Sequence, residues 1–459
     1  MEGPRTKRLP ALLLALSMLA PLPARAAQPE TPPVSPWACD AMYEALALGL
    51  WEADGTDSVL EEITDEQLER IGSIVSDRLA LLKAPARAPA PPPAIDTTRG
   101  GVVNALYRQA AVWDFPEVEA DADAVDCLVE MGVLLGRGEA RDLALESPCT
   151  LQEALVMAQR LVLHLYDRRG AGAQGFLWRA EGNGNTLYLL GTIHVDRDNI
   201  YPLSGRLREI IAGADDAIFE VDFGDKEDTQ AFLAMQDYPE GEALRDHVSG
   251  ALFQEAVAVG AALPQPYTMD EAAVDRYKPW AYANLVNSVT LLMGEDSLED
   301  PLAVDTYIYN KAVSSGVTVD AVESYVYQGE LFDSLSGPYQ AGYLSGALSG
   351  FRAAQRGDTV SSGVEDISRW VEWWKSGDAA SFAAAYGKDE VLRAADELDE
   401  RLLLRRDPGM IEYADRYLSA EGPRTGILVV GAAHMIGETG VVRGLQALGY
   451  TVELAPDGR

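Results

Sequence analysis

Two stretches of sequence decide the fold, Leu187-Tyr-Leu-Leu-Gly191-Thr-Ile-His194 and Ile427-Leu-Val-Val-Gly431-Ala-Ala-His434. Each is an apolar run of strand type that is followed by the same Gly-x-x-His arrangement. The 459-residue chain has four histidines, and these two motifs contain half of them. Functional side chains of open α/β sheets gather beyond the carboxyl ends of the strands. We therefore expect the two imidazoles to meet at one edge of one sheet.

Further strand-like runs surround these motifs and alternate with helical patterns. The runs are residues 176–181, 217–223, 317–323 and 450–454, and Gly182-Asn-Gly-Asn185 is a strong hairpin turn signal between the first two strands. Strands that alternate with helices predict an α/β fold with a central β-sheet. The long helical patterns, about residues 241–314 and 339–418, would form a large cap insertion over one edge of that sheet.

The N-terminal third has a different character, and we divide it into three parts. Residues 1–26 have basic residues, an apolar run and Ala24-Arg25-Ala26, which is typical of a cleaved signal peptide. Residues 27–96 combine a helical segment with a Pro/Ala-rich linker, and residues 97–174 are a second helical module. Residues 175–459 form the expected catalytic domain. A cleaved signal predicts a periplasmic or secreted protein with no integral membrane segment.

Charge and cysteine content limit the partners. A formal net charge of −35 disfavours binding to nucleic acid and to anionic membranes. The cysteines are Cys39, Cys127 and Cys149, none in a Cys-x-x-Cys pair. In an oxidising compartment we expect one disulfide, with Cys127–Cys149 closing the shorter loop.

Four residues at or near strand ends are able to bind a metal or transfer protons: His194, Glu220, Glu323 and His434. Two imidazoles with one or two carboxylates suit zinc, manganese, cobalt or iron. A bound metal would acidify a water molecule, and a spare carboxylate would carry its proton. A lone histidine after a strand is more often structural, but the repeated motif favours function.

The acidic positions leave alternatives open. Asp222 shares a strand face with Glu220 and is the alternative functional acid, and Asp320 is the alternative to Glu323. Other catalytic signatures, such as His-Glu-x-x-His, Gly-x-Ser-x-Gly and the phosphate-binding Gly-rich loop, do not occur in the sequence.

Several weak motifs in a fixed order resemble the TraB/PrgY/GumN family over about residues 175–457. They are Leu-Trp178, the first Gly-x-x-His motif, Phe-Glu220-Val-Asp, Lys278-Pro-Trp280, Val-Asp305, Ala-Val-Glu323 with Gln328, Arg406-Asp-x-x-Met410, and the second Gly-x-x-His motif with Gly437 and Gly440. The wider group includes the TIKI proteins, which are metal-dependent peptidases that act on secreted signalling proteins.

The resemblance implies His194 and His434 as metal ligands or catalytic bases, with Glu220 as their acidic partner, both a metal ligand and a catalytic residue. It implies Glu323, Asp305 and Arg406 as further catalytic residues, and a divalent metal (Mn, Co or Zn) as cofactor. The family pattern has asparagine after the arginine, where this chain has Asp407.

The sequence thus predicts a secreted or periplasmic metal-dependent hydrolase, a peptidase with a peptide or protein substrate. One alternative is a non-catalytic accessory protein that binds a peptide or polysaccharide in the same crevice. Another is an esterase-like hydrolase in which a histidine is a metal-free general base.

Overall fold

The computed structural model describes residues 34–52, 58–87, 95–119, 122–138, 141–193, 200–292, 303–357 and 361–455. The expected signal peptide, most of the Pro/Ala-rich linker and His194 lie outside these residues.

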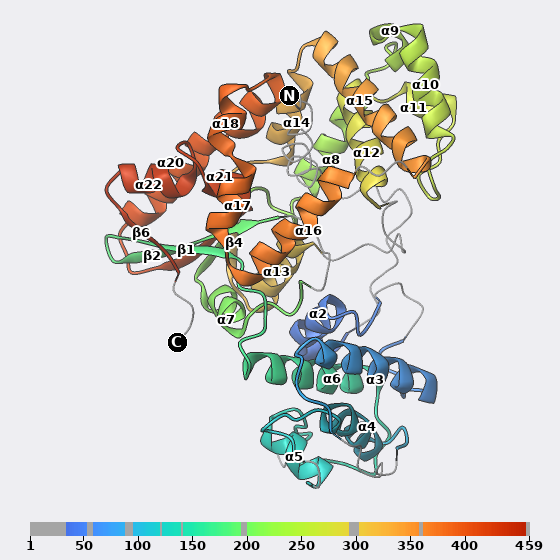
Figure 1. The fold of residues 1–459 in the computed structure, drawn as a ribbon, viewed down its shortest axis with the longest axis vertical. Coiled ribbons are helices and arrows are strands. Elements are labelled where there is room, and N and C mark those ends of the chain that lie inside the picture. The colour runs from blue at the N-terminus through green and yellow to red at the C-terminus, as the bar shows by residue number, and fades with distance from the viewer. Residues whose placement is uncertain are drawn as a thin grey trace.

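A six-stranded mixed sheet organises the family-like part of the chain, and its strands β1, β2, β4 and β6 are labelled in Figure 1. Its strand order is β4-β3-β5-β2-β1-β6, with β1 (Phe176–Gly182), β2 (Asn185–Thr192), β3 (Asp216–Phe219), β4 (Thr318–Ala321), β5 (Thr425–Gly431) and β6 (Thr451–Leu454). Strands β4, β3, β5 and β2 run parallel to one another, and β1 is antiparallel to β2 and to β6. The protein is therefore α/β, as the alternation of strands and helices predicts.

The hairpin between β1 and β2 forms where the turn signal lies. Gly182 pairs with Asn185, and the two residues between them have positive φ angles, 48° at Asn183 and 86° at Gly184. Two such residues match the right-handed twist of the strands, which explains why Asn-Gly occupies this turn.

Two strands are shorter than their apolar runs suggest. The run 217–223 predicts a longer strand, but β3 ends at Phe219 and leaves Glu220 in the connection that follows. The run 317–323 is likewise a strand only over Thr318–Ala321. Beyond the ends of β3 and β4 the two segments are still joined by backbone hydrogen bonds. The N–H of Glu323 donates to the carbonyl of Glu220 at 2.8 Å.

Helices connect and cover the strands. The helices of this part are α7 (Gly205–Gly213), α13 (Val304–Ser314), α16 (Ser361–Ser376), α17 (Ala379–Tyr386), α18 (Lys388–Arg393), α20 (Asp407–Ser419), α21 (Ala432–Met435) and α22 (Val441–Ala447). The indole N–H of Trp374 in α16 donates to Gly191 O at 2.8 Å, which fixes this helix to the first Gly-x-x-His motif.

A second group of helices has a hydrophobic core of its own, at the upper right of Figure 1. These helices are α8 (Lys226–Met235), α9 (Leu244–His247), α10 (Gly250–Gly260), α11 (Glu271–Asp275), α12 (Pro279–Leu292), α14 (Tyr325–Asp333) and α15 (Gly337–Gln355). The short helix α19 (Glu397–Asp399) and a π-helical turn (Glu400–Leu404) lead from this group to α20.

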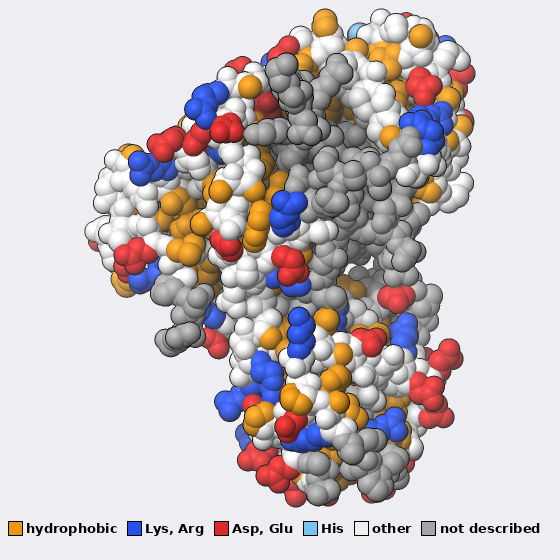
Figure 2. All heavy atoms as spheres, viewed as in Figure 1, with side chains coloured by type: hydrophobic (Ala, Val, Ile, Leu, Met, Phe, Trp, Pro, Cys, Tyr) orange, Lys and Arg blue, Asp and Glu red, His pale blue; other side chains and the backbone are white. Residues whose placement is uncertain are grey.

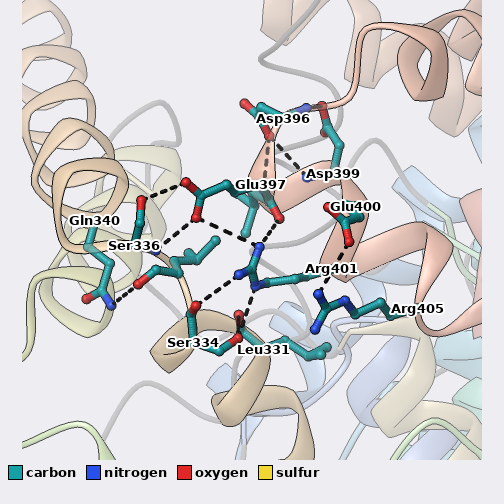
Figure 3. A network of polar contacts seen from close by, with 12 residues as sticks. Leu331, Ser334, Ser336, Gln340, Asp396, Glu397, Asp399, Glu400, Arg401 and Arg405 are labelled. Carbon is teal, nitrogen blue, oxygen red and sulfur yellow. Dashed lines mark hydrogen bonds and ion pairs between the residues drawn. The ribbon is translucent and has the colours of Figure 1, made fainter.

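Polar contacts join these helices to the segment before α20 (Figure 3). Arg401 donates to the backbone carbonyl and to the hydroxyl of Ser334, at 2.9 and 3.0 Å. The hydroxyl of Ser336 donates to Glu397 at 2.6 Å. These contacts fix the chain just ahead of Arg406, the residue that precedes α20.

The N-terminal third is helical, as its pattern predicts. It contains α2 (Cys39–Ala47), α3 (Asp65–Ala80), α4 (Arg99–Ala111), α5 (Ala124–Glu130) and α6 (Leu151–Asp167), preceded by a 3-10 turn (Pro36–Ala38). We call these helices the N-terminal module. Its buried apolar side chains belong to the same hydrophobic cluster as those of the sheet.

The expected disulfide is wrong, because all three cysteines are free thiols. Cys127 Sγ contacts the carbonyl of Glu117, whereas Cys149 Sγ contacts that of Thr150, so the two thiols lie in different surroundings. None of the helices in the described part of the chain is long and apolar enough to cross a membrane. Acidic and basic side chains are interspersed on the face in Figure 2.

Candidate functional site

The two Gly-x-x-His motifs begin side by side. Strands β2 and β5 are parallel neighbours, and Thr192 lies opposite Gly431 at their carboxyl ends. Gly191 lies so close to Ala432 that a Cβ atom on Gly191 would be 3.0 Å from the Cα of Ala432. A side chain at position 191 would therefore push the motifs apart, which explains the glycine. His194 itself lies outside the described residues.

His434 is completely buried in the single turn of α21, directly after β5. Its Nδ1 lies 2.8 Å from Oδ1 of Asp407. A carboxylate only accepts hydrogen bonds, so Nδ1 carries the proton of this contact and a neutral ring keeps its lone pair on Nε2. Nε2 has no hydrogen-bond partner among the described residues. A buried polar atom left in this state points to a ligand or a reacting group.

Asp407 is the centre of a second layer of contacts behind His434. Its Oδ2 accepts hydrogen bonds from Lys388 Nζ at 2.6 Å and from the Thr439 hydroxyl at 2.7 Å. Burial alone would raise the pKa of Asp407, but the contacts with His434 and Lys388 outweigh it and lower the pKa below its usual range. Asp407 is therefore an anion held between two donors on one oxygen and the imidazole on the other.

Lys388 reaches Asp407 because the turn after His434 leaves room for it. Gly437 has a φ of +81°, and a Cβ there would be 3.0 Å from the Lys388 side chain. The next residue, Glu438, donates its backbone N–H to Asp389 at 2.9 Å. Burial lowers the pKa of Lys388, and Asp407 opposes that shift.

Glu220, Glu323 and Arg406 form a second buried network. The guanidinium of Arg406 lies 2.6 Å from Glu220 and 2.8 Å from Glu323. Gln328 adds donors to both carboxylates, at 3.3 and 3.1 Å. Burial would lower the pKa of Arg406, but the two carboxylates raise it, so the guanidinium stays charged. Such pairing is what buried charges need.

Glu220 also joins two strand ends. Its Oε1 accepts a hydrogen bond from the backbone N–H of Gly431 at 2.6 Å. Gly431 is the last residue of β5 and the first of the second Gly-x-x-His motif. The Glu220 carboxylate thus ties the end of β3, through Gly431, to the residues that lead to His434.

Asp305 belongs to the other half of the site. It lies in the first turn of α13 and accepts a hydrogen bond from the Thr192 hydroxyl at 2.7 Å. Thr192 ends β2, two residues before His194. Asp305 therefore contacts the end of the first motif's strand.

The acidic alternatives are placed elsewhere. Asp222 is half-buried and accepts from the Tyr309 hydroxyl at 3.0 Å and from Gly224 N at 2.8 Å. Asp320 is exposed and contacts the Tyr413 hydroxyl. Glu220 and Glu323, in contrast, lie together in the buried network around Arg406.

The histidine half of this centre fits a metal better than the carboxylate half. A metal-binding histidine usually gives its other ring nitrogen to a carboxylate, as His434 gives Nδ1 to Asp407. Both oxygens of Glu220 already accept hydrogen bonds, from Gly431 and from Arg406. The described residues contain no group of three His, Cys, Asp or Glu side chains able to hold a metal ion. Ligation by Glu220 and His194 stays a prediction.

Sequence reasoning missed Lys388 and Thr439, and it noted Asp407 only as a departure from a family pattern. Lys388 follows a glycine in a helical region and has no motif around it. A buried partner of this kind is visible only in the tertiary structure.

These contacts define an α/β protein with a buried histidine–carboxylate centre at the carboxyl ends of parallel strands. The chain belongs to the TraB/PrgY/gumN family, whose sequence model matches residues 176–454. The match spans the sheet and the residues of both buried networks, and the N-terminal module lies ahead of it. Neither a curated protein nor a solved structure matches the chain.

Proposed function

We propose that this protein is a metal-dependent hydrolase, a peptidase that acts on peptides or proteins outside the cytoplasm. The observation that carries the proposal is the buried Nε2 of His434, which has no partner among the described residues while Asp407 holds Nδ1. The family resemblance supports the reaction class, and the signal-like residues 1–26 support the location.

In this proposal His194 and His434 hold the metal, and Glu220 is the candidate third ligand. A bound divalent metal would lower the pKa of a water molecule to near neutrality and polarise a carbonyl group. Asp407 fixes the ring of His434, with Lys388 and Thr439 fixing Asp407 in turn. Glu220 and Glu323 are the acid–base carboxylates of this proposal, and Arg406 keeps both in place.

We also propose that the helices of the second hydrophobic core cap the site. Gln328 of α14 donates to both Glu220 and Glu323, so this group of helices contacts the carboxylate network directly. Asp228 of α8 receives the backbone N–H of Val326 at 3.2 Å, which fixes the start of α14. A substrate selected by these helices would meet the carboxylates first.

The same histidine geometry favours a second candidate, a metal-free hydrolase. A carboxylate that holds the ring of a histidine is also the arrangement of a general base, in which Nε2 takes the proton of the nucleophile. The His434–Asp407 contact meets that need without a metal.

One experiment separates these proposals. The purified protein is analysed for bound metal and is incubated with a diverse peptide pool, with and without a chelator, with mass spectrometry of the products. Bound metal and chelator-sensitive cleavage support the metal-dependent peptidase. Cleavage that persists without metal supports the second candidate. Peptides that are retained but never cut would overturn both and favour a binding protein.

A further inference from the structure

Helix α13 connects the candidate site to the N-terminal module. At its first turn Asp305 accepts the hydroxyl of Thr192, the last residue of β2. Farther along the same helix, Tyr307 and Lys311 contact α2 of the module. One short helix therefore touches both the first motif's strand and a part of the chain outside the family match.

The contact with the module is an ionic cluster in which Lys311 and Glu44 are buried and Asp40 is exposed. Lys311 Nζ lies 2.9 Å from Asp40 and 2.9 Å from Glu44. The hydroxyl of Tyr307 donates to Glu44 at 2.7 Å. Burial would lower the pKa of Lys311, but Glu44 and Asp40 raise it, so the lysine stays charged. A buried charge pair fixes geometry strongly, because neither partner is stable when the other moves.

A second contact reaches the chain on the other side of His194. Arg78 of α3 donates to the carbonyl of Tyr201 at 3.1 Å, and Tyr201 packs on Tyr307 with ring centroids 5.0 Å apart. Thr192 and Tyr201 flank, in sequence, the segment that carries His194. The module therefore holds one flank directly, through Arg78, and the other through α13.

We propose that the N-terminal module is a positioning element for the end of β2, the described part of the first Gly-x-x-His motif, and that Glu44 and Lys311 are its positioning residues. The proposal rests on the proposed function only in taking this motif as functional. The second motif is held by other elements, since the partners of His434 and Asp407 come from α18, α20 and the turn after α21. The module would thus act on the first motif directly and on the second only through the pairing of β2 with β5.

The test uses single substitutions in the full-length protein, because removal of the module would expose a shared core. The variants are Glu44→Gln, Lys311→Met and the double variant. The matched control is Glu153→Gln, which breaks a buried pair inside the module, where Arg99 lies 2.7 Å from Glu153. Hydrogen exchange is followed by mass spectrometry in residues 304–314 and 185–193, and turnover is measured per folded molecule.

We expect both single variants to speed exchange at the start of α13 and at the end of β2 by about tenfold or more. Turnover should fall by roughly 10-fold to 100-fold, as for other supporting contacts of active sites. The double variant should recover part of the slow exchange and part of the turnover, because neither Lys311 nor Glu44 then leaves a buried charge without its partner. The amide oxygen introduced at position 44 still accepts the hydrogen bond from the Tyr307 hydroxyl. The control should change exchange only within the module.

Unchanged exchange in α13 and β2 in both single variants would overturn the inference, whatever the activity. Faster exchange with unchanged turnover would also overturn it, since the contact would then be structural only. If the wild-type protein has no hydrolytic activity, the proposed function fails, and the exchange data alone decide whether the module holds this motif.

Discussion

Arg406 and Asp407 are adjacent in sequence, but their side chains enter two different buried networks. Arg406 binds Glu220 and Glu323, whereas Asp407 binds His434 and Lys388. The start of α20 therefore joins the carboxylate half of the site to the histidine half. A shift of this one turn would disturb both.

Removal of the imidazole should abolish function and leave the fold. His434→Ala is expected to lower hydrolytic activity by at least roughly 100-fold, because contacts one layer farther out are already worth about 10–100-fold. Bound metal, measured by elemental analysis, should fall in parallel. The control is His247→Ala, since His247 is exposed and stacks on Tyr238 with ring centroids 4.3 Å apart. Equal activity in the two variants would exclude His434 from the chemistry.

Loss of the Arg406 charge should destabilise the protein through its carboxylate partners. Arg406→Met leaves Glu220 and Glu323 buried without a cation, at a cost of about 3–5 kcal/mol in the free energy of unfolding. Adding Glu323→Gln removes one of these charges and should restore part of the loss. Denaturant unfolding of the single and double variants measures both effects, and additive losses would contradict the coupling.

The Asp407–Lys388 pair predicts an order among substitutions. Asp407→Asn keeps an oxygen for the His434 ring, whereas Asp407→Ala removes it, and both substitutions take the carboxylate partner from Lys388. We expect Asp407→Ala to lower the free energy of unfolding by about 3–5 kcal/mol, and Asp407→Asn to lower it by less. Adding Lys388→Met to Asp407→Asn should recover stability. The same stability for Asp407→Asn with and without Lys388 would show that the pair is not coupled.

A fall in pH should lower the stability of the N-terminal module, because Glu153 becomes protonated. Burial would raise the pKa of this group, but Arg137, the Thr150 N–H and Arg99 lower it below the usual 4.5. Because the folded-state pKa lies below the unfolded one, the stabilisation is present above about pH 4.5 and is lost as the pH falls through the folded value. Unfolding measured across this range should show a steeper acid loss for the wild type than for Glu153→Gln. Parallel curves would contradict this.

The thiols offer a direct check on the cysteines. All three cysteines are free, and burial, with Glu153 nearby, raises the pKa of Cys149 to about 12. We expect a thiol reagent to find three reactive groups in denaturant without reductant, and slow reaction of Cys149 in the native protein. A count of one would show that a disulfide has formed.

Much of the sheet could be predicted from local pattern. The apolar runs, the Asn183-Gly184 turn and the paired Gly-x-x-His motifs have signals that depend only on neighbouring residues, and each strand lies where its run predicts it. The ends of β3 and β4 could not be placed, because the residues beyond them, Glu220 and Glu323, have partners in distant segments of the chain.

The candidate site could be predicted in part, for a similar reason. A repeated motif marks His434, and their places within apolar runs mark Glu220 and Glu323. Lys388 and the module's Glu44 have no such mark, because their partners come from distant segments. Residues that come together only in the folded structure leave no periodic pattern in the sequence.

The place of β5 in the sheet has a consequence for how the protein is made. β5 lies between β2 and β3 and pairs with both, although its residues are synthesised more than two hundred positions after theirs. During translation, therefore, both of those strands wait with an unpaired edge, and pairings this distant in sequence form slowly. A ribosome-bound chain that has not reached Thr425 should be the species most in need of a chaperone.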